Sequence, residues 1–365
     1  MKKLLLIILS IFIFSCNDPV FYSISMEELP LDPRIAGPST NFAGINNKMY
    51  VAARRTIYCY DSEGYENENY KIGQWSKYPV SGRITHLAAI NNKLYALAEN
   101  RIIRFSDTIT EEASFTIANQ TIHGIFAAED ILFISTSNME IYYLPEGEAA
   151  PLQIIGGEFS ILCGVASDNL NYYLCNTTDK SKTENDGIFL MPKGNMGNVT
   201  LVPESTNKEF TGIINLSSGS IAAMSRGGRL FSVTSAEVKE ERRFSDSRKA
   251  TSALCVWSND EYSLLLVGRQ DLTNSTTTGY THGYVEIEFD AGTGALIGES
   301  FREPGRTAAS SISQDTNEHY ASSIGKRGVN YFYQAKDGIL FASLNHGVWS
   351  YRDRSAGKFT WNAEE

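Results

Sequence analysis

The stretch GILFASLNHGVWSYRDRSAGKFTWN, residues 338–362, decides the fold because partial copies of it recur along the chain. A window of thirteen residues inside it, 339–351, aligns without gaps with residues 48–60, 93–105 and 221–233. Each copy has an apolar pair, small or apolar residues, a tight turn and a second apolar run. This periodicity predicts a repeat architecture, and it does not indicate what the protein binds.

An apolar pair marks the second strand of each repeat. The pairs are Met49-Tyr50, Leu94-Tyr95, Leu132-Phe133, Tyr172-Tyr173, Ala222-Ala223, Leu264-Leu265 and Leu340-Phe341. Their second members are separated by 45, 38, 40, 50, 42 and 76 residues. A spacing near forty is typical of β-propeller blades with four short strands. A third strand is predicted after each pair, at residues 57–60, 102–105, 141–144, 188–191, 230–233, 284–287 and 348–351.

First strands are predicted before the marker pairs, as at residues 41–45 and 86–90, and the inner strands are apolar on both sides instead of alternating. A blade lies between two neighbours, so both of its faces must be buried, and a closed ring achieves this. We therefore predict an all-β fold, a seven-bladed β-propeller, as one domain over residues 39–365. Eight blades remain the alternative, although the mostly polar residues 305–328 are interpreted as a long connection.

The length and composition agree with a ring of strands. The chain has 365 residues, is 42% hydrophobic, and contains nineteen Tyr and eighteen Phe, which suit half-buried strands. A ring accommodates this length in one domain because each repeat adds its own core layer.

The last copy resembles the repeat of the two-component regulator propeller family, through residues 340–351 followed by Gly357, Lys358, Phe359 and Thr360. That resemblance implies a propeller fold and an exported setting, because such repeats form periplasmic sensor ectodomains. A lipid-anchored propeller also looks like the outer-membrane assembly lipoproteins of the β-barrel insertion machinery. A sensor or envelope assembly factor is therefore one alternative function.

The N-terminus predicts export. Lys2 and Lys3 precede an apolar run, residues 4–14, which is too short to span a bilayer comfortably and ends at Cys16. This pattern resembles a bacterial lipoprotein signal, residues 1–16, in which Cys16 becomes the lipidated N-terminus and anchors the protein to the cell envelope. An ordinary secretion signal is the alternative. Residues 17–38, which contain four prolines, are interpreted as a tether.

The charge excludes two classes of partner. The net charge is -10, and it becomes -12 when Lys2 and Lys3 are removed with the signal. An acidic surface repels nucleic acid and anionic lipid headgroups, so we expect no nucleic acid partner and membrane contact only through the lipid.

Four cysteines follow Cys16, at positions 59, 163, 175 and 255. Cys163 and Cys175 fall on consecutive predicted strands, so a cross-strand disulfide is geometrically conceivable in an oxidising compartment. Buried free thiols are the interpretation that we favour, because a small apolar cysteine fills a core well.

No established catalytic or metal motif is present, and we predict no cofactor. His86 and His123 lie on predicted inner strands at positions offset by one, so we expect their side chains to point to different sides. The polar side chains Asn41, Asp130, Asp168 and Asp260 lie near predicted strand ends. Turn residues explain them best, while their convergence at the channel mouth would indicate a propeller enzyme, a hydrolase or lyase.

Loop length distinguishes two repeats. The connection from the marker pair to the third strand has six residues in the second repeat. It has fourteen residues in the fourth repeat and eighteen in the sixth. Both insertions, residues 176–186 and 270–282, join equivalent strands and must emerge on the same face of a ring. We predict that they form the binding face of a non-enzymatic module for a protein or glycan partner. The candidate binding residues are Asp179, Lys180, Lys182, Asn274, Tyr280 and His282.

Overall fold

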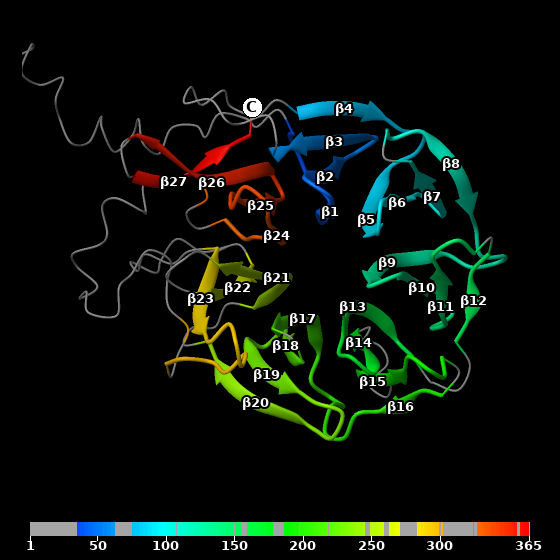
Figure 1. Ribbon diagram of the computed structural model, residues 1–365, viewed down its shortest axis with the longest axis vertical. Helices are drawn as coiled ribbons and strands as arrows, with labels where there is room; N and C mark the ends of the chain where they lie inside the picture. Colours follow the sequence, from blue (N-terminus) through cyan, green and yellow to red (C-terminus); the bar gives the residue numbers. More distant parts are fainter. Residues whose placement is uncertain are drawn as a thin grey trace, which may run out of the picture.

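The computed structural model is a closed ring of β-sheets (Figure 1). It describes residues 35–62, 75–106, 108–148, 150–154, 159–177, 186–196, 198–217, 219–244, 249–258, 263–270, 283–298, 301, 324, 327–355 and 358–364. Within these residues the chain forms seven sheets, which confirms the all-β, seven-bladed propeller. No helix in this part of the chain is long and apolar enough to cross a membrane.

Each blade begins with an inner strand that faces the centre of the ring. The inner strands are β1 (Ala43–Ile45), β5 (Ile84–Ile90), β9 (Ile122–Ala128), β13 (Ile161–Ser167), β17 (Phe210–Ser217), β21 (Ala250–Ser258) and β24 (Tyr331–Gln334). The second strands are β2 (Lys48–Ala53), β6 (Lys93–Ala98), β10 (Ile131–Thr136), β14 (Asn171–Thr177), β18 (Ser220–Ser225), β22 (Ser263–Arg269) and β25 (Leu340–Leu344). Every marker pair lies in one of these second strands, as predicted.

The outer half of each blade is antiparallel to the inner half. The third strands are β3 (Thr56–Asp61), β7 (Arg101–Phe105), β11 (Ile141–Pro145), β15 (Gly187–Pro192), β19 (Arg229–Val233), β23 (Tyr284–Phe289) and β26 (Gly347–Ser355). The outermost strands are β4 (Trp75–Pro79), β8 (Glu111–Phe115), β12 (Leu152–Gln153), β16 (Thr200–Leu201), β20 (Val238–Arg243) and β27 (Lys358–Ala363). Among the described residues, blade 6 has three strands, and Phe289 on its outer strand forms a single bridge with Leu296.

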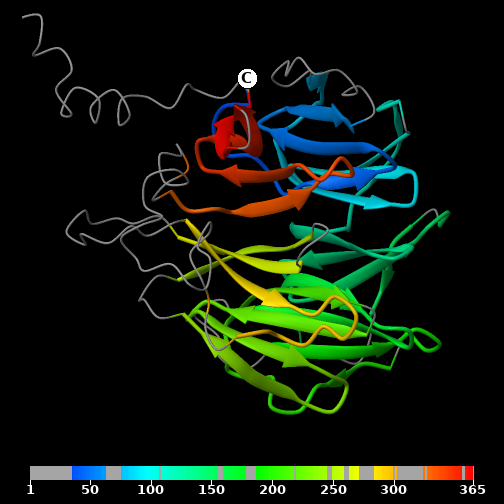
Figure 2. The same cartoon turned by 60° about the vertical axis from the view of Figure 1, so that its left-hand side comes forward.

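Seven apolar clusters fill the spaces between adjacent blades, one for each interface. Alternate residues of one strand belong to different clusters. Tyr50 and Ala52 of β2 pack toward blade 2, whereas Met49 and Val51 pack toward blade 7. This is why the second strands are apolar on both sides, and Figure 2 shows the sheets packed face to face around the ring.

Amide side chains join some neighbouring blades by pairing with both backbone groups of one residue. Asn41 donates to the Leu87 carbonyl at 2.6 Å and accepts from the Leu87 N–H at 2.9 Å. Asn215 makes the same two contacts with Ser167, and Gln334 makes them with Ser258. We call each of these an amide clamp.

The ring closes between blade 7 and blade 1 without exchange of a strand, because each of these sheets is built from consecutive strands. The segment before β1 lies on blade 7, where Ala36 forms a bridge with Gly347 and Ile35 is fully buried. The Trp75 indole N–H donates to the buried Glu364 carboxylate at 2.9 Å. Aromatic packing between Tyr60 and Phe341, with ring centroids 4.9 Å apart, completes the joint.

Candidate functional site

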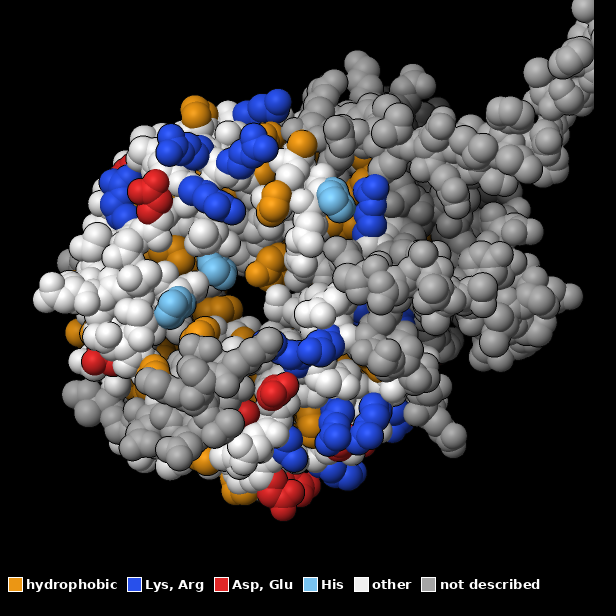
Figure 3. Space-filling model, turned by 180° about the vertical axis from the view of Figure 1, so that it is seen from behind, with side chains coloured by type: hydrophobic (Ala, Val, Ile, Leu, Met, Phe, Trp, Pro, Cys, Tyr) orange, Lys and Arg blue, Asp and Glu red, His pale blue; other side chains and the backbone are white. Residues whose placement is uncertain are grey.

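The two faces of the ring carry different turns. Turns between second and third strands emerge on one face, together with the connections from each blade to the next, because successive strands are antiparallel. Both insertions join such strands: Asn176 pairs with Gly187 at the base of the first, and Gly268 pairs with Tyr284 at the base of the second. We call this the insertion face, and Figure 3 shows it with the central opening.

The candidate binding residues themselves, Asp179, Lys180, Lys182, Asn274, Tyr280 and His282, lie outside the described residues, as does Cys16. Their predicted roles therefore stay predictions.

The bases of the insertions are firmly held. Asp186, which is buried, accepts hydrogen bonds from the backbone N–H groups of Asn207, at 2.7 Å, and Glu209, at 3.2 Å. At the second insertion, Arg269 is 2% exposed and one of its guanidinium nitrogens donates to the Tyr284 carbonyl. Both insertions thus leave from ordered ends of strands.

The inner strands enclose a central cavity of about 650 Å³. Its wall combines aromatic and aliphatic side chains, including Phe126, Ile213, Tyr331 and Tyr333, and the described residues that line it include no Asp, Glu, Lys or Arg. Its described wall is therefore without formal charge and mixes polar and apolar groups.

Both His86 and His123 are among the residues that line this cavity. Each belongs to an inner strand near the insertion face, where Figure 3 shows histidine side chains beside the opening. The His86 ring packs against the Phe126 ring, with centroids 6.2 Å apart. Burial lowers the pKa of His86 to about 4, which keeps the imidazole neutral at physiological pH. Across the described residues no group of three or more His, Cys, Asp or Glu side chains is arranged to hold a metal.

A second cavity of about 610 Å³ opens beside the β2–β3 turn. It is lined by Arg54, Arg55 and Arg83 together with Tyr58, Thr56, Ala53 and Ala36. Arg54 and Arg55 form the β2–β3 turn and Arg83 lies in the connection to β5, so all three belong to the insertion face. We call this cavity the arginine groove.

The three arginines of the groove are exposed, and none forms an ion pair with a carboxylate in the described part of the chain. Some other cations do form ion pairs, for example Arg101 with Glu111 at 3.4 Å and Lys193 with Glu129 at 2.5 Å. Figure 3 shows Lys and Arg side chains gathered on this face. An uncompensated cationic groove on a protein with a net charge of -10 is suited to an anionic ligand.

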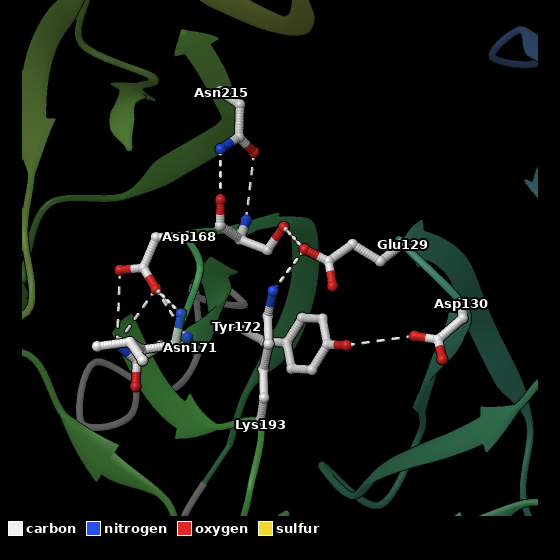
Figure 4. Close-up of polar contacts among 9 residues, drawn as sticks. Glu129, Asp130, Asp168, Asn171, Tyr172, Lys193 and Asn215 are labelled. Carbon is white, nitrogen blue, oxygen red and sulfur yellow. Dashed lines mark hydrogen bonds and ion pairs between the residues drawn. The ribbon is translucent and has the colours of Figure 1, made fainter. Parts of the chain in front are cut away.

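The opposite face carries a polar network on blades 3 to 5 (Figure 4). Burial disfavours the charge of Asp168, but hydrogen bonds from the Tyr173 hydroxyl and the backbone of its own turn lower its pKa below the ordinary value. The hydrogen bond from Lys193 holds the pKa of Glu129 below its usual range. These carboxylates stabilise turns and blade contacts.

The polar residues considered for a channel-mouth enzyme have separate roles. Asp168 caps its own turn, Asp130 accepts a long hydrogen bond of 3.5 Å from Tyr172, and Asn41 forms an amide clamp. Neither aspartate lines the central cavity, and Asp260 lies outside the described residues. The interpretation as turn residues agrees with the contacts of Asp168 and with the place of Asp130 in the β9–β10 turn, whereas Asn41 joins two blades and also lines the central cavity.

Comparisons with known proteins establish the fold alone. No protein-family model matches the chain, so none supports the resemblance to two-component regulator propellers, and a comparison with curated proteins finds no match. A chain in the crystal structure of the mitotic checkpoint complex is similar, with a TM-score of 0.58 and 12% identity over 90% of this chain and 94% of that one. The WD40 propeller domain of Doa1 has a TM-score of 0.55 and 8% identity, over 89% and 97% of the two chains. The computationally designed protein Ika8 has a TM-score of 0.53 and 13% identity, over 89% and 98%.

The arginine groove was missed by the sequence reasoning. The adjacent pair Arg54-Arg55 in a short turn was a visible signal, but Arg83 lies almost thirty residues later. Placing them together requires knowing that the connection to β5 emerges beside the β2–β3 turn.

Proposed function

We propose that the protein is a non-enzymatic binding module of a bacterial cell envelope, anchored through a lipid on Cys16, whose insertion face binds an acidic segment of a protein partner. The observation that carries this proposal is the arginine groove, where three guanidinium groups surround one cavity without a described carboxylate partner. The propeller fold is consistent with a binding or scaffold module.

Guanidinium groups favour carboxylate ligands. Each presents a planar fork of N–H donors that matches a carboxylate in two parallel hydrogen bonds, and it stays charged at every physiological pH. Three such groups around one groove suit a segment with several Asp or Glu residues better than a single isolated carboxylate.

A protein partner fits the groove better than a glycan. A sugar ring needs an open aromatic face, and Tyr58 is the single aromatic residue among the described residues that line the groove. The Lys77 ammonium lies 5.8 Å from the centroid of the Tyr58 ring, so a cation already faces it. The groove therefore presents charge instead of a stacking platform.

Charge reversal tests the groove directly. The test variant combines Arg55→Glu with Arg83→Glu in the groove. The control variant combines Lys48→Glu with Lys336→Glu at exposed positions on the opposite face, and it changes the net charge by the same amount. The probe is a fluorescent oligoglutamate peptide, with binding followed by anisotropy at low and physiological salt. We expect the groove variant to lose at least about tenfold in affinity and the control variant to keep the wild-type value.

The same two variants are then compared by crosslinking and pull-down from intact cells, alongside Cys16→Ala. Equal peptide binding by both charge variants would remove the groove as the binding site. Unchanged membrane association of Cys16→Ala would separately contradict the lipid anchor.

A further inference from the structure

Two cysteine sulfur atoms touch in blade 4. Cys163 of β13 and Cys175 of β14 have their Sγ atoms 3.5 Å apart, and both are free thiols. The Cys163 thiol also lies 3.3 Å from the Cys175 carbonyl oxygen, to which it donates. The pair is thus in van der Waals contact in the reduced state.

A β-bulge produces this contact. Leu162 pairs with Asn176 and Gly164 pairs with Cys175, so Cys163 is the extra residue and two positions on β13 face one on β14. The next blade lies close against this bulge, because a Cβ on Gly164 would lie 3.1 Å from the Ile213 side chain of β17. The two thiols are therefore kept adjacent by the fold.

The two thiols differ in their access to solvent. Cys163 is half-buried, lines the central cavity and packs against the core between blades 4 and 5, in which Cys175 is fully buried. A small reagent in the channel reaches Cys163 first. Burial raises the pKa of the Cys175 thiol well above its ordinary value, so Cys175 does not attack a reagent independently.

We propose that Cys163 and Cys175 form a reversible disulfide by exchange with a small-molecule disulfide, such as oxidised glutathione, that enters the central channel. This site is independent of the proposed binding function. The cavity of about 650 Å³ is large enough to admit such a molecule, and its described wall carries no charge that would repel it.

The reaction proceeds by two exchanges. Deprotonated Cys163 attacks one sulfur of the small disulfide, whose S–S bond breaks, and one small thiolate leaves and takes up a proton. Cys175 then attacks the Cys163 sulfur of the mixed disulfide, whose S–S bond breaks, and its proton passes to the departing small thiolate, which leaves as the second small thiol. Two protein thiols are oxidised and one small disulfide is reduced. The sulfur atoms must approach by about 1.5 Å from their separation of 3.5 Å to reach bonding distance.

Peptide mapping of the folded full chain tests the proposal. The protein is incubated with oxidised glutathione, and the remaining thiols are alkylated in denaturant. No Lys or Arg lies between the two cysteines, so trypsin leaves them in one peptide, and chymotrypsin then cuts at Tyr172 or Tyr173 between them. We expect the two fragments to stay linked and to separate after treatment with dithiothreitol.

Single variants identify the order of the steps. Cys175→Ser should accumulate a glutathione adduct on Cys163, because the resolving thiol is missing. Cys163→Ser should leave Cys175 unmodified in the folded protein. Complete alkylation of both wild-type cysteines after incubation, or an adduct on Cys175 in the Cys163→Ser variant, would overturn the proposal.

Discussion

Small residues on the inner strands let neighbouring blades approach closely at the centre of the ring. Gly44 on β1 lies against Tyr333 on β24, across the joint between the first and last blades. A Cβ at position 44 would lie 1.7 Å from the Tyr333 hydroxyl oxygen and 2.8 Å from its Cζ atom. Contacts this short force the Tyr333 side chain or the strand to shift.

We therefore expect Gly44→Ala to lower the free energy of unfolding by about 1–3 kcal/mol, measured by urea denaturation, because overpacking displaces the tyrosine. Gly194→Ala is the control, since a Cβ there meets nothing within 4 Å. Combining Gly44→Ala with Tyr333→Leu should recover part of the loss. An undiminished loss in that double variant would show that the tyrosine is not its cause.

His86 makes stability depend on pH. Its pKa falls from 6.5 to about 4 in the fold because burial at the channel wall disfavours the charged ring. The unfolded chain therefore binds the proton more tightly, and stability that is complete above pH 6.5 is lost as the pH falls toward 4. No charged group contributes to this shift.

Relative to His86→Gln, the wild-type protein should lose on the order of 2 kcal/mol of unfolding free energy across that interval. Urea denaturation of both proteins at a series of pH values measures the difference, in which the acid sensitivity of all other groups cancels. Above pH 7 the difference should be constant. A difference that does not change between neutral pH and about pH 4 would mean that His86 is protonated equally well in the fold.

Amide clamps act between elements, because each joins one blade to the backbone of the next. Asn41→Ala leaves the Leu87 N–H and carbonyl without their partners in the Asn41 side chain. We expect a loss of about 1–3 kcal/mol in unfolding free energy, measured by urea denaturation. Asn195→Ala, at an exposed turn, should change it by less than about 0.5 kcal/mol. If the two substitutions lowered the unfolding free energy equally, the amide clamp would contribute no more to stability than an ordinary surface contact.

In each blade, the positions of the inner, second and third strands were predictable from the sequence. The position of the outermost strand was not. Tyr50 and Leu94 lie in apolar runs because their strands are buried on both faces, so the recurring apolar pairs identified them. The outer strand β20, with the sequence VKEERR, is exposed to solvent on much of its length and has no such pattern. The repeat pattern in the sequence is weaker wherever one side of a strand is exposed to solvent, because the side chains there need not be apolar.

Pairings between distant segments were also beyond the sequence. Asn41 looked like a turn residue, and the Leu87 backbone that it binds is 46 positions away. The Cys163 and Cys175 contact was conceivable from the sequence, yet the bulge that brings the sulfur atoms together was not. The two insertions were located correctly by repeat comparison, whereas the arginine groove required the three-dimensional order of turns.

At the scale of the whole molecule, the insertions should be dispensable for folding. Replacing residues 178–185 and 271–282 with short Asn-Gly turns leaves the described strands and their clusters intact. We expect the melting temperature to change by less than about 2 °C for each replacement. Partner capture from intact cells should fall sharply in the same variants. Full capture with both loops replaced would limit the binding face to the arginine groove.

The closure between the last and first blades also has a mechanical consequence. The chain enters the ring at Ile35, and its first backbone bridge, Ala36 to Gly347, lies on blade 7 instead of blade 1. Tension applied at the N-terminus, as an anchored molecule experiences when its partner is pulled away, therefore loads the seam between the first and last blades. The buried Ile35 side chain and this bridge bear the force before any strand of blade 1 does. The seam is then the point from which the ring opens under load.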